Sequence, residues 1–238
     1  TVNCLYQANV AGITMPVVTD ACGKPLTPGE VSIDSTDFLV NGCEGAMVFS
    51  YPYQDCAGHE KVWKFTYHIQ LPEELANVPA NGGRIVPCLV DVVAPGAATI
   101  TDICGNTVTS ELVGSDTTLY ENGTGTVHFY YKYKDCAGHD STWTYTYTLN
   151  PDSFTPEVDS VKQIACLRDT VTPQTPSVKD CGNVVPVVYD SVHVATTSCD
   201  SAVYYYHYRV RGVDYVWKYT YKVKPLPFSI PADSVVKV

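Results

Sequence analysis

The sequence lacks the features of membrane-spanning, helical and nucleic-acid-binding proteins. No apolar run approaches the roughly 20 residues that span a bilayer, and apolar residues at helical spacing extend over no more than one turn, near residues 72–76. Methionine is rare, with two residues, and acidic side chains outnumber basic ones, which gives a net charge of −10. That charge makes nucleic acid and anionic membranes poor partners. We therefore expect neither nucleic-acid binding nor membrane insertion.

Tyrosine and cysteine, in contrast, are abundant, with 18 and ten residues. The stretch 127–149 consists of two runs of alternating aromatic residues around the sequence D-C-A-G-H. Trp143, Tyr145 and Tyr147 fall on one face of an extended strand, and threonines fall on the other. A period of two in aromatic and β-branched residues is typical of a half-buried strand. The stretch therefore predicts a β-hairpin whose aromatic face must be covered.

This hairpin occurs three times, at residues 49–69, 127–149 and 204–223. The three tryptophans of the chain occupy one equivalent position in it. Upstream of each hairpin lies a short sequence ending in Cys-Gly (D-A-C-G, D-I-C-G and K-D-C-G), and a further cysteine opens each unit. Repetition at roughly 80 residues indicates a tandem array of small domains.

The strand pattern predicts an all-β chain of three tandem immunoglobulin-like antiparallel β-sandwich domains in an elongated array. The expected repeats are residues 1–78, 79–150 and 151–225, and residues 226–238 are expected to be a linker and the opening strand of a following repeat. Within the first repeat, strands are expected at 4–9 and 38–40, among others. The tail resembles residues 159–164, so we expect the chain to be a segment of a longer array.

The motif D-C-A-G-H followed by W-x-Y-T-Y, with D-x-C-G upstream, resembles the hyalin-repeat-like (HYR-like) immunoglobulin-fold modules of giant Bacteroidota surface adhesins. The first two repeats carry the full motif, and the third keeps only Gly212 and W-K-Y-T-Y. The resemblance implies a non-catalytic stalk or adhesin segment on the extracellular bacterial surface. Its partners would be adjacent repeats of the same longer chain or fibre.

The cysteines predict bonds between repeats. Cys43 and Cys56 flank one strand and lie about 30 Å apart at strand rise, too far for a disulfide. Cys43 is expected at the pole facing the second repeat, and Cys136 at the pole facing the first, so we predict a Cys43–Cys136 bond. We expect Cys56 and Cys199 to reach neighbouring units. The remaining cysteines are expected to pair within domains, as Cys4–Cys22, Cys88–Cys104 and Cys166–Cys181. The alternative keeps every bridge within a domain and leaves cysteines unpaired in the second and third repeats.

The D-C-A-G-H turns also contain residue types found in catalytic and metal sites. Cys136 and His139 could form a nucleophilic pair of a hydrolase, and Cys-x-x-His could supply half of a zinc site, but repetition at a hairpin tip favours a turn. We predict no catalytic residue, no metal and no cofactor. The alternative function is a carbohydrate- or surface-binding module of a secreted multidomain protein, with outward tyrosines such as Tyr205 contacting surface glycans.

Asp-Ser and Asp-Thr pairs resemble an O-glycosylation acceptor motif of Bacteroidota surface proteins, although such pairs also form turns. The candidate acceptors are Ser35, Thr117, Ser141, Ser160, Thr170, Ser191, Ser201 and Ser234.

Overall fold

The computed structural model describes residues 1–35, 43–194 and 200–230, and this part of the chain is all-β, with short 3-10 turns and no α-helix. The chain divides into two compact units. The first comprises Thr1–Gly83, Ala94–Asp116 and His128–Thr146, and the second comprises Arg84–Val93, Thr117–Val127 and Tyr147–Val238. The division passes through the second repeat. The junction of repeats 1 and 2 therefore lies within the first unit, and the junction of repeats 2 and 3 lies within the second.

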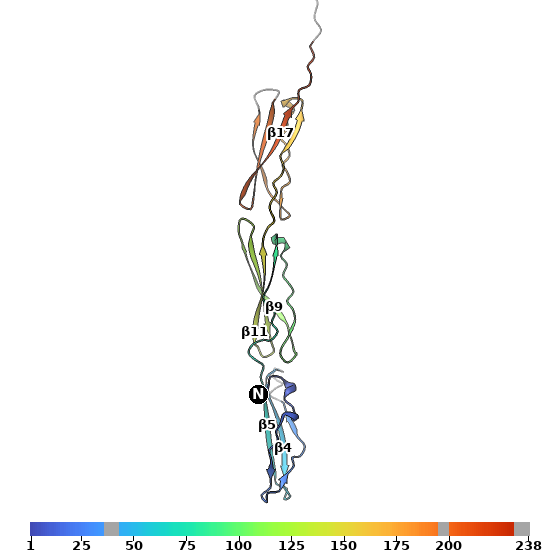
Figure 1. Cartoon of the computed structure of the whole chain (residues 1–238), viewed down its shortest axis with the longest axis vertical. Helices are drawn as coiled ribbons and strands as arrows, with labels where there is room; N and C mark the ends of the chain where they lie inside the picture. The colour runs from blue at the N-terminus through green and yellow to red at the C-terminus, as the bar shows by residue number, and fades with distance from the viewer. Residues whose placement is uncertain (36–42, 195–199, 231–238) are drawn as a thin grey trace, which may run out of the picture. The chain divides into compact units, whose positions relative to one another are not determined.

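The first repeat contains a three-stranded sheet in the order β3-β4-β5 and a separate two-stranded hairpin, β1-β2. The aromatic hairpin forms the long strands β4 and β5, which run antiparallel and in register from end to end (Figure 1). Val2 pairs with Ile69 in a parallel bridge at the edge of β5. The strand bounds are β1 Val18–Thr19, β2 Pro25–Leu26, β3 Ser32–Asp34, β4 Gly45–Gln54 and β5 Glu60–Ile69.

The second and third repeats each contain a four-stranded sheet, β6-β11-β10-β9 and β12-β17-β16-β15, and a two-stranded hairpin, β7-β8 and β13-β14. In the third repeat the opening strand β12 runs parallel to the last strand β17. The bounds in the second repeat are β6 Gly82–Val86, β7 Ile100–Thr101, β8 Thr107–Val108, β9 Ser110–Leu119, β10 Gly125–Lys134 and β11 Asp140–Leu149. Those in the third are β12 Ser160–Ile164, β13 Lys179–Asp180, β14 Asn183–Val184, β15 Val187–Val194, β16 Ser201–Val210 and β17 Val213–Val223.

The aromatic faces of the hairpins form the cores. In β16 burial alternates along the strand, so Tyr204, Tyr206 and Tyr208 are buried and their neighbours are not. Tyr133 of β10 is fully buried, and Trp143 of β11 packs against Tyr131. The period-two prediction of a half-buried aromatic hairpin is confirmed, because the inward residues are the ones that the alternation selects.

The layer facing each sheet has little regular structure, and core tyrosines donate hydrogen bonds to its backbone. Tyr133 Oη donates to the Ala98 carbonyl at 2.7 Å, and Tyr206 Oη donates to the Pro173 carbonyl at 2.7 Å. Tyr67, Tyr131, Tyr147 and Tyr221 donate to loop carbonyls of their own repeats in the same way. A chain segment without strand partners must satisfy its buried carbonyls otherwise. This requirement accounts for tyrosine, rather than phenylalanine, as the dominant core aromatic.

One expected strand differs from the structure, and two other expectations fall on residues outside the described ranges. Residues 4–9 do not form a strand, because η1 (Leu5–Gln7) turns the chain immediately after Cys4. Residues 38–40 lie outside the described residues, as do residues 231–238 of the tail, whose described part, 226–230, contains no strand. The boundaries of the three expected domains stay a prediction.

Candidate functional site: disulfide-linked junctions

Each repeat opens with a cysteine followed directly by one 3-10 turn. Cys4, Cys88 and Cys166 precede η1 (Leu5–Gln7), η4 (Leu89–Asp91) and η5 (Leu167–Asp169). Their backbones are nearly identical, with φ of −128°, −136° and −141° and ψ of 148°, 151° and 147°. This turn follows the edge strand that pairs with the last strand of the repeat. The opening cysteine therefore lies at the end where the chain leaves the repeat.

The D-x-C-G loops of the first two repeats are closed by their aspartates. Asp102 Oδ1 accepts hydrogen bonds from the backbone N–H of Cys104 and of Asn106, both at 2.8 Å. Asp20 makes the same two bonds to Cys22 and Lys24, at 2.9 and 2.8 Å. A side-chain oxygen that satisfies two loop amides fixes the loop locally. Cys22 and Cys104 are therefore presented in the same way.

The D-C-A-G-H turns are also alike in the first two repeats. Asp135 Oδ1 accepts from the His139 backbone N–H at 2.9 Å, and its Oδ2 lies 3.0 Å from His139 Nδ1. Asp55 and His59 repeat both contacts, each at 2.9 Å. Hydrogen bonding from His59 lowers the pKa of the Asp55 carboxyl. The turn glycines Gly58 and Gly138 have φ of +86° and +96°, a backbone conformation that residues with a side chain rarely adopt.

Two disulfides join the first repeat to the second within the first compact unit. Cys4 is bonded to Cys104, with a Cα–Cα separation of 5.4 Å, and Cys43 is bonded to Cys136, with 5.9 Å. Each bond therefore joins the leaving end of repeat 1 to a loop at the entering end of repeat 2. The Cys43–Cys136 bond is the predicted one, and it is formed by cysteines 93 residues apart.

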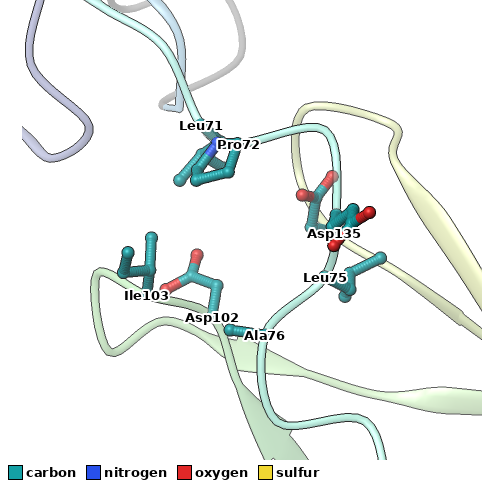
Figure 2. A pocket seen from close by; sticks show the side chains of 8 residues that line it. Leu71, Pro72, Leu75, Ala76, Asp102, Ile103 and Asp135 are labelled. Atoms are coloured by element: carbon teal, nitrogen blue, oxygen red, sulfur yellow. The ribbon is translucent and has the colours of Figure 1, made fainter.

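A cavity of about 290 Å³ lies beside this junction. Figure 2 shows linker side chains, including Leu71 and Leu75, on one part of its wall and Asp102 and Ile103 on another. Asn77 of the linker donates to the Thr101 carbonyl at 2.9 Å. Of the three carboxylates in this wall, Asp102 and Asp135 are engaged by the amides of their own loops, and the third is Glu74 of the linker. Among the described residues, no three His, Cys, Asp or Glu side chains gather where they could hold a metal ion.

The junction of repeats 2 and 3, within the second unit, has a different composition. Cys88 is bonded to Cys181, with a Cα–Cα separation of 5.6 Å. The hairpin tip of repeat 3 is a two-residue turn at Arg211 and Gly212, both with positive φ. Arg211 donates to both carboxylate oxygens of Asp180, at 2.7 and 3.1 Å, and to the Asp152 carbonyl. This junction therefore has one disulfide between the repeats, and beside it Arg211 forms a bidentate ion pair with Asp180 of its own repeat.

Sequence reasoning missed that ion pair. The available signal was the shortening of D-C-A-G-H to R-G in the third hairpin, which replaces a cysteine by an arginine. The arginine side chain also contacts Gly123, where an added Cβ would lie 3.4 Å from Arg211 Cδ. Gly123 stands two residues before β10, as Cys43 stands two residues before β4. The stem of Arg211 thus packs against repeat 2 in the region that holds the second disulfide in the other junction, while its ion pair stays within repeat 3.

The pairings predicted within domains are wrong. Cys4 bonds to Cys104 rather than Cys22, and Cys88 bonds to Cys181 rather than Cys104. Short sequence separation suggested these pairs, but the opening cysteine and the Cys-Gly loop of one repeat lie at its opposite ends. Cys22 and Cys56 are free and exposed, and Cys166 is free and half-buried, so the predicted Cys166–Cys181 bond is also absent. Cys199 lies outside the described residues.

The remaining candidates are distributed over the surface and the core. The Cys136 thiol is not available as a nucleophile, because it is oxidised to a disulfide. Tyr205 is half-buried, with the Lys218 ammonium 5.9 Å from its ring centroid. The described O-glycosylation candidates are exposed or half-buried, and Ser191 donates to Asp190 Oδ2 at 2.8 Å; Ser234 lies outside the described residues. The structure therefore gathers the cysteines at junctions but does not gather the tyrosines or hydroxyls into a site.

Comparisons with known proteins agree with the repeat pattern. A family model described as the HYR-like domain with 4 cysteines matches residues 1–69 and 76–149. No curated protein matches the chain. No helix in the described residues is long and apolar enough to cross a membrane.

Several solved structures show distant likeness. The human desmocollin-1 ectodomain has 10% identity and a TM-score of 0.29, covering 89% of this chain and 57% of its own. The mouse clustered PcdhgC3 EC1-3 structure has 8% identity and a TM-score of 0.25, and the match covers 76% of this chain and 77% of that one. An endo-fucoidan hydrolase from glycoside hydrolase family 107 has 9% identity and a TM-score of 0.27, covering 85% and 39%. The chain thus spans little more than half of the desmocollin chain.

Proposed function

Because the chain belongs to the family of HYR-like domains with four cysteines, we propose that it is a non-catalytic, load-bearing segment of an extracellular adhesin or fibre on a bacterial surface. The observation that carries the proposal is the pair of disulfides that join consecutive repeats, Cys4–Cys104 and Cys43–Cys136. Disulfides persist in oxidising, extracellular environments. Contacts between tandem domains are otherwise small and readily opened.

The connectivity of the bonds supports a mechanical role. A covalent path from end to end runs from Thr1 to Cys4, crosses to Cys104, returns to Cys88, crosses to Cys181 and continues to the end. Force applied at the two ends would follow this path, because a disulfide does not yield before non-covalent structure does. Only about a third of the residues would then be extended, and the rest would stay in closed covalent loops.

Stretching single molecules of the full chain from its two ends tests the proposal. Under non-reducing conditions we expect the fully unfolded molecule to extend to roughly 27 nm, against roughly 83 nm after reduction, at about 3.5 Å per residue. The same molecules before and after addition of reductant provide the control. Release of the full contour without reductant would contradict a load path through the disulfides.

Carbohydrate binding is the alternative function, and it depends on aromatic side chains presented to solvent. Tyr204, Tyr206 and Tyr208 are committed to the core, and Tyr205 is half-buried. Screening the folded chain on a glycan array tests this alternative. We expect no specific glycan; a specific signal lost in Tyr205→Ala would favour the binding module.

A further inference from the structure

We propose that the exposed thiols Cys22 and Cys56 of the first repeat form a docking face for the leaving end of another HYR-like repeat, closed by two disulfides. The proposal rests on the proposed function, since it assigns the partner that a load-bearing repeat would take. The partner is identified by its chemistry: a repeat with a free cysteine before its first 3-10 turn and another just before its penultimate strand.

The molecule itself contains an occupied example of this face. In repeat 2, Cys104 on the D-x-C-G loop and Cys136 on the D-C-A-G-H turn receive Cys4 and Cys43 of repeat 1. In repeat 1, Cys22 and Cys56 occupy the same places on the same two turns. The difference is that both of these cysteines are free and exposed.

The unbonded face of repeat 1 is held by the same loop hydrogen bonds as the disulfide-bonded face of repeat 2. Asp20 closes its loop on the amides of Cys22 and Lys24, as Asp102 does on those of Cys104 and Asn106. The backbone N–H of Asp20 also bonds to the Lys24 carbonyl at 2.9 Å, as that of Asp102 does to Asn106 at 2.9 Å. The loop conformation is therefore present without the bonded partner, and docking requires no rebuilding of the turn.

The chain also carries a cysteine of the kind that this face would accept. Cys166 is free, and its backbone conformation is that of Cys4 and Cys88, both of which are bonded to the Cys-Gly loop of the next repeat. The third repeat of one copy therefore offers Cys166 to Cys22 of a second copy.

The bonds form by thiol–disulfide exchange with a disulfide oxidant such as oxidised glutathione. The Cys166 thiolate attacks glutathione disulfide and releases one glutathione thiol. The Cys22 thiolate then attacks the protein sulfur of the mixed disulfide and releases the second. Formation of each protein disulfide therefore removes two thiol protons and two electrons from the protein, and these leave in two molecules of reduced glutathione. The second pair reacts in the same way.

A tandem protein tests the proposal with both partners in one chain. Residues 1–236 followed by a complete second copy give the sequence D-S-V-V-T-V-N-C at the join. An aspartate and a cysteine are then spaced as Asp159 and Cys166 are in the natural chain. After folding in glutathione buffer, non-reducing peptide mapping should find Cys166 of the first copy bonded to Cys22 of the second.

Free thiols provide a second readout of the same sample. Cys22 and Cys166 are free in each copy, so the tandem protein carries four such thiols before docking. Docking protects Cys166 of the first copy and Cys22 of the second from alkylation and leaves the other two reactive. Alkylation of all four, or a Cys22–Cys56 bond within one copy, would overturn the proposal. Cys166→Ser in the first copy is the matched variant, and it should abolish only the bond to Cys22.

Separately folded single chains guard against misfolding of the tandem protein. Mixed at high concentration with oxidised glutathione, they should form head-to-tail oligomers containing the Cys22–Cys166 peptide. Monomers, or symmetric dimers through Cys22 or Cys56, would overturn docking. The stretching experiment depends only on disulfides within one chain, whereas docking depends on a bond between copies. Loss of docking would therefore leave the stretching result unchanged, and the two proposals can fail separately.

Discussion

At the scale of single residues, the aspartates of the D-x-C-G loops both accept hydrogen bonds from two loop amides, in an exposed loop at Asp20 and in a part-buried one at Asp102. Asp102 is only 6% exposed and accepts a third hydrogen bond, from Asn106 Nδ2 at 2.8 Å. Asp102→Ala leaves part-buried amides without acceptors, so we expect the free energy of unfolding to fall by about 1–3 kcal/mol. Urea unfolding of the oxidised protein measures this loss. Asp20→Ala is the matched control and should have a smaller effect, because water replaces the lost acceptor; equal losses would contradict the argument.

The Asp55–His59 pair predicts a pH effect of known sign. Hydrogen bonding from His59 lowers the pKa of Asp55, so the folded state favours the ionised carboxylate. The resulting stabilisation is complete above the ordinary aspartate pKa of about 3.9 and is lost as the pH falls through the lowered value. We expect carboxyl NMR titration to show Asp55 titrating below exposed aspartates, and His59→Ala to raise its pKa. An unchanged Asp55 pKa in that variant would refute the assigned cause.

At the scale of elements, the hairpins could be predicted from the sequence, and the layer facing them could not. The alternation in β10, β11, β16 and β17 follows from one buried face, which is a local property of a strand. The sequence predicts a strand at residues 4–9, but the chain turns there in η1 and again in η2 (Val10–Gly12). Its backbone partners are tyrosine hydroxyls such as that of Tyr67, which donates to the Asn9 carbonyl from a strand 58 residues away. No local pattern encodes such a contact.

The cysteine pairing shows the same division between local and distant information. The Cys43–Cys136 bond could be predicted because strand direction assigns each of these cysteines to a pole. The bonds of Cys4 and Cys88 could not, because no local pattern shows that the 3-10 turn after each opening cysteine lies at the leaving end of its repeat. Cys22, the partner predicted for Cys4, lies at the other end of the repeat.

The ion pair at the second junction gives a prediction for a single element, the tip of the β16–β17 hairpin. Arg211 and Asp180 are 18% and 23% exposed and form two charge-assisted hydrogen bonds. Arg211→Ala leaves the carboxylate partly buried and unpaired, so we expect a loss of about 1–3 kcal/mol in the free energy of unfolding. Arg211→Lys should recover only part of it, since an ammonium cannot reproduce the bidentate geometry.

A double-mutant cycle with Asp180→Ala separates the pair from its surroundings. The coupling between the two positions should account for most of the loss in Arg211→Ala, and it should change little with added salt because both side chains are mostly buried. Additive effects of the two substitutions would instead assign the loss to the packing of the arginine stem against Gly123.

At the scale of the whole molecule, the disulfides overlap along the sequence, and each has a different mechanical consequence. Cys4–Cys104 and Cys88–Cys181 lie on the shortest covalent path between the chain ends, whereas Cys43–Cys136 lies off it. The bond off the path does not shorten the extended chain. Its effect is to fix the first junction at a second point, so that the two repeats cannot pivot about a single bond.

Removing each bond of the first junction therefore has a distinct predicted result in the stretching experiment. In Cys4→Ser/Cys104→Ser, the shortest covalent path must use the whole chain up to Cys88. The extended part of the molecule should therefore rise from about a third to about three-fifths of the residues, with a proportional increase in its extended length. In Cys43→Ser/Cys136→Ser it should stay at about a third. That variant should differ in NMR relaxation instead, with residues of repeats 1 and 2 acquiring separate rotational correlation times. Equal contour lengths in the two variants would show that force does not follow the Cys4–Cys104 bond, and the load path argued from the connectivity would be wrong.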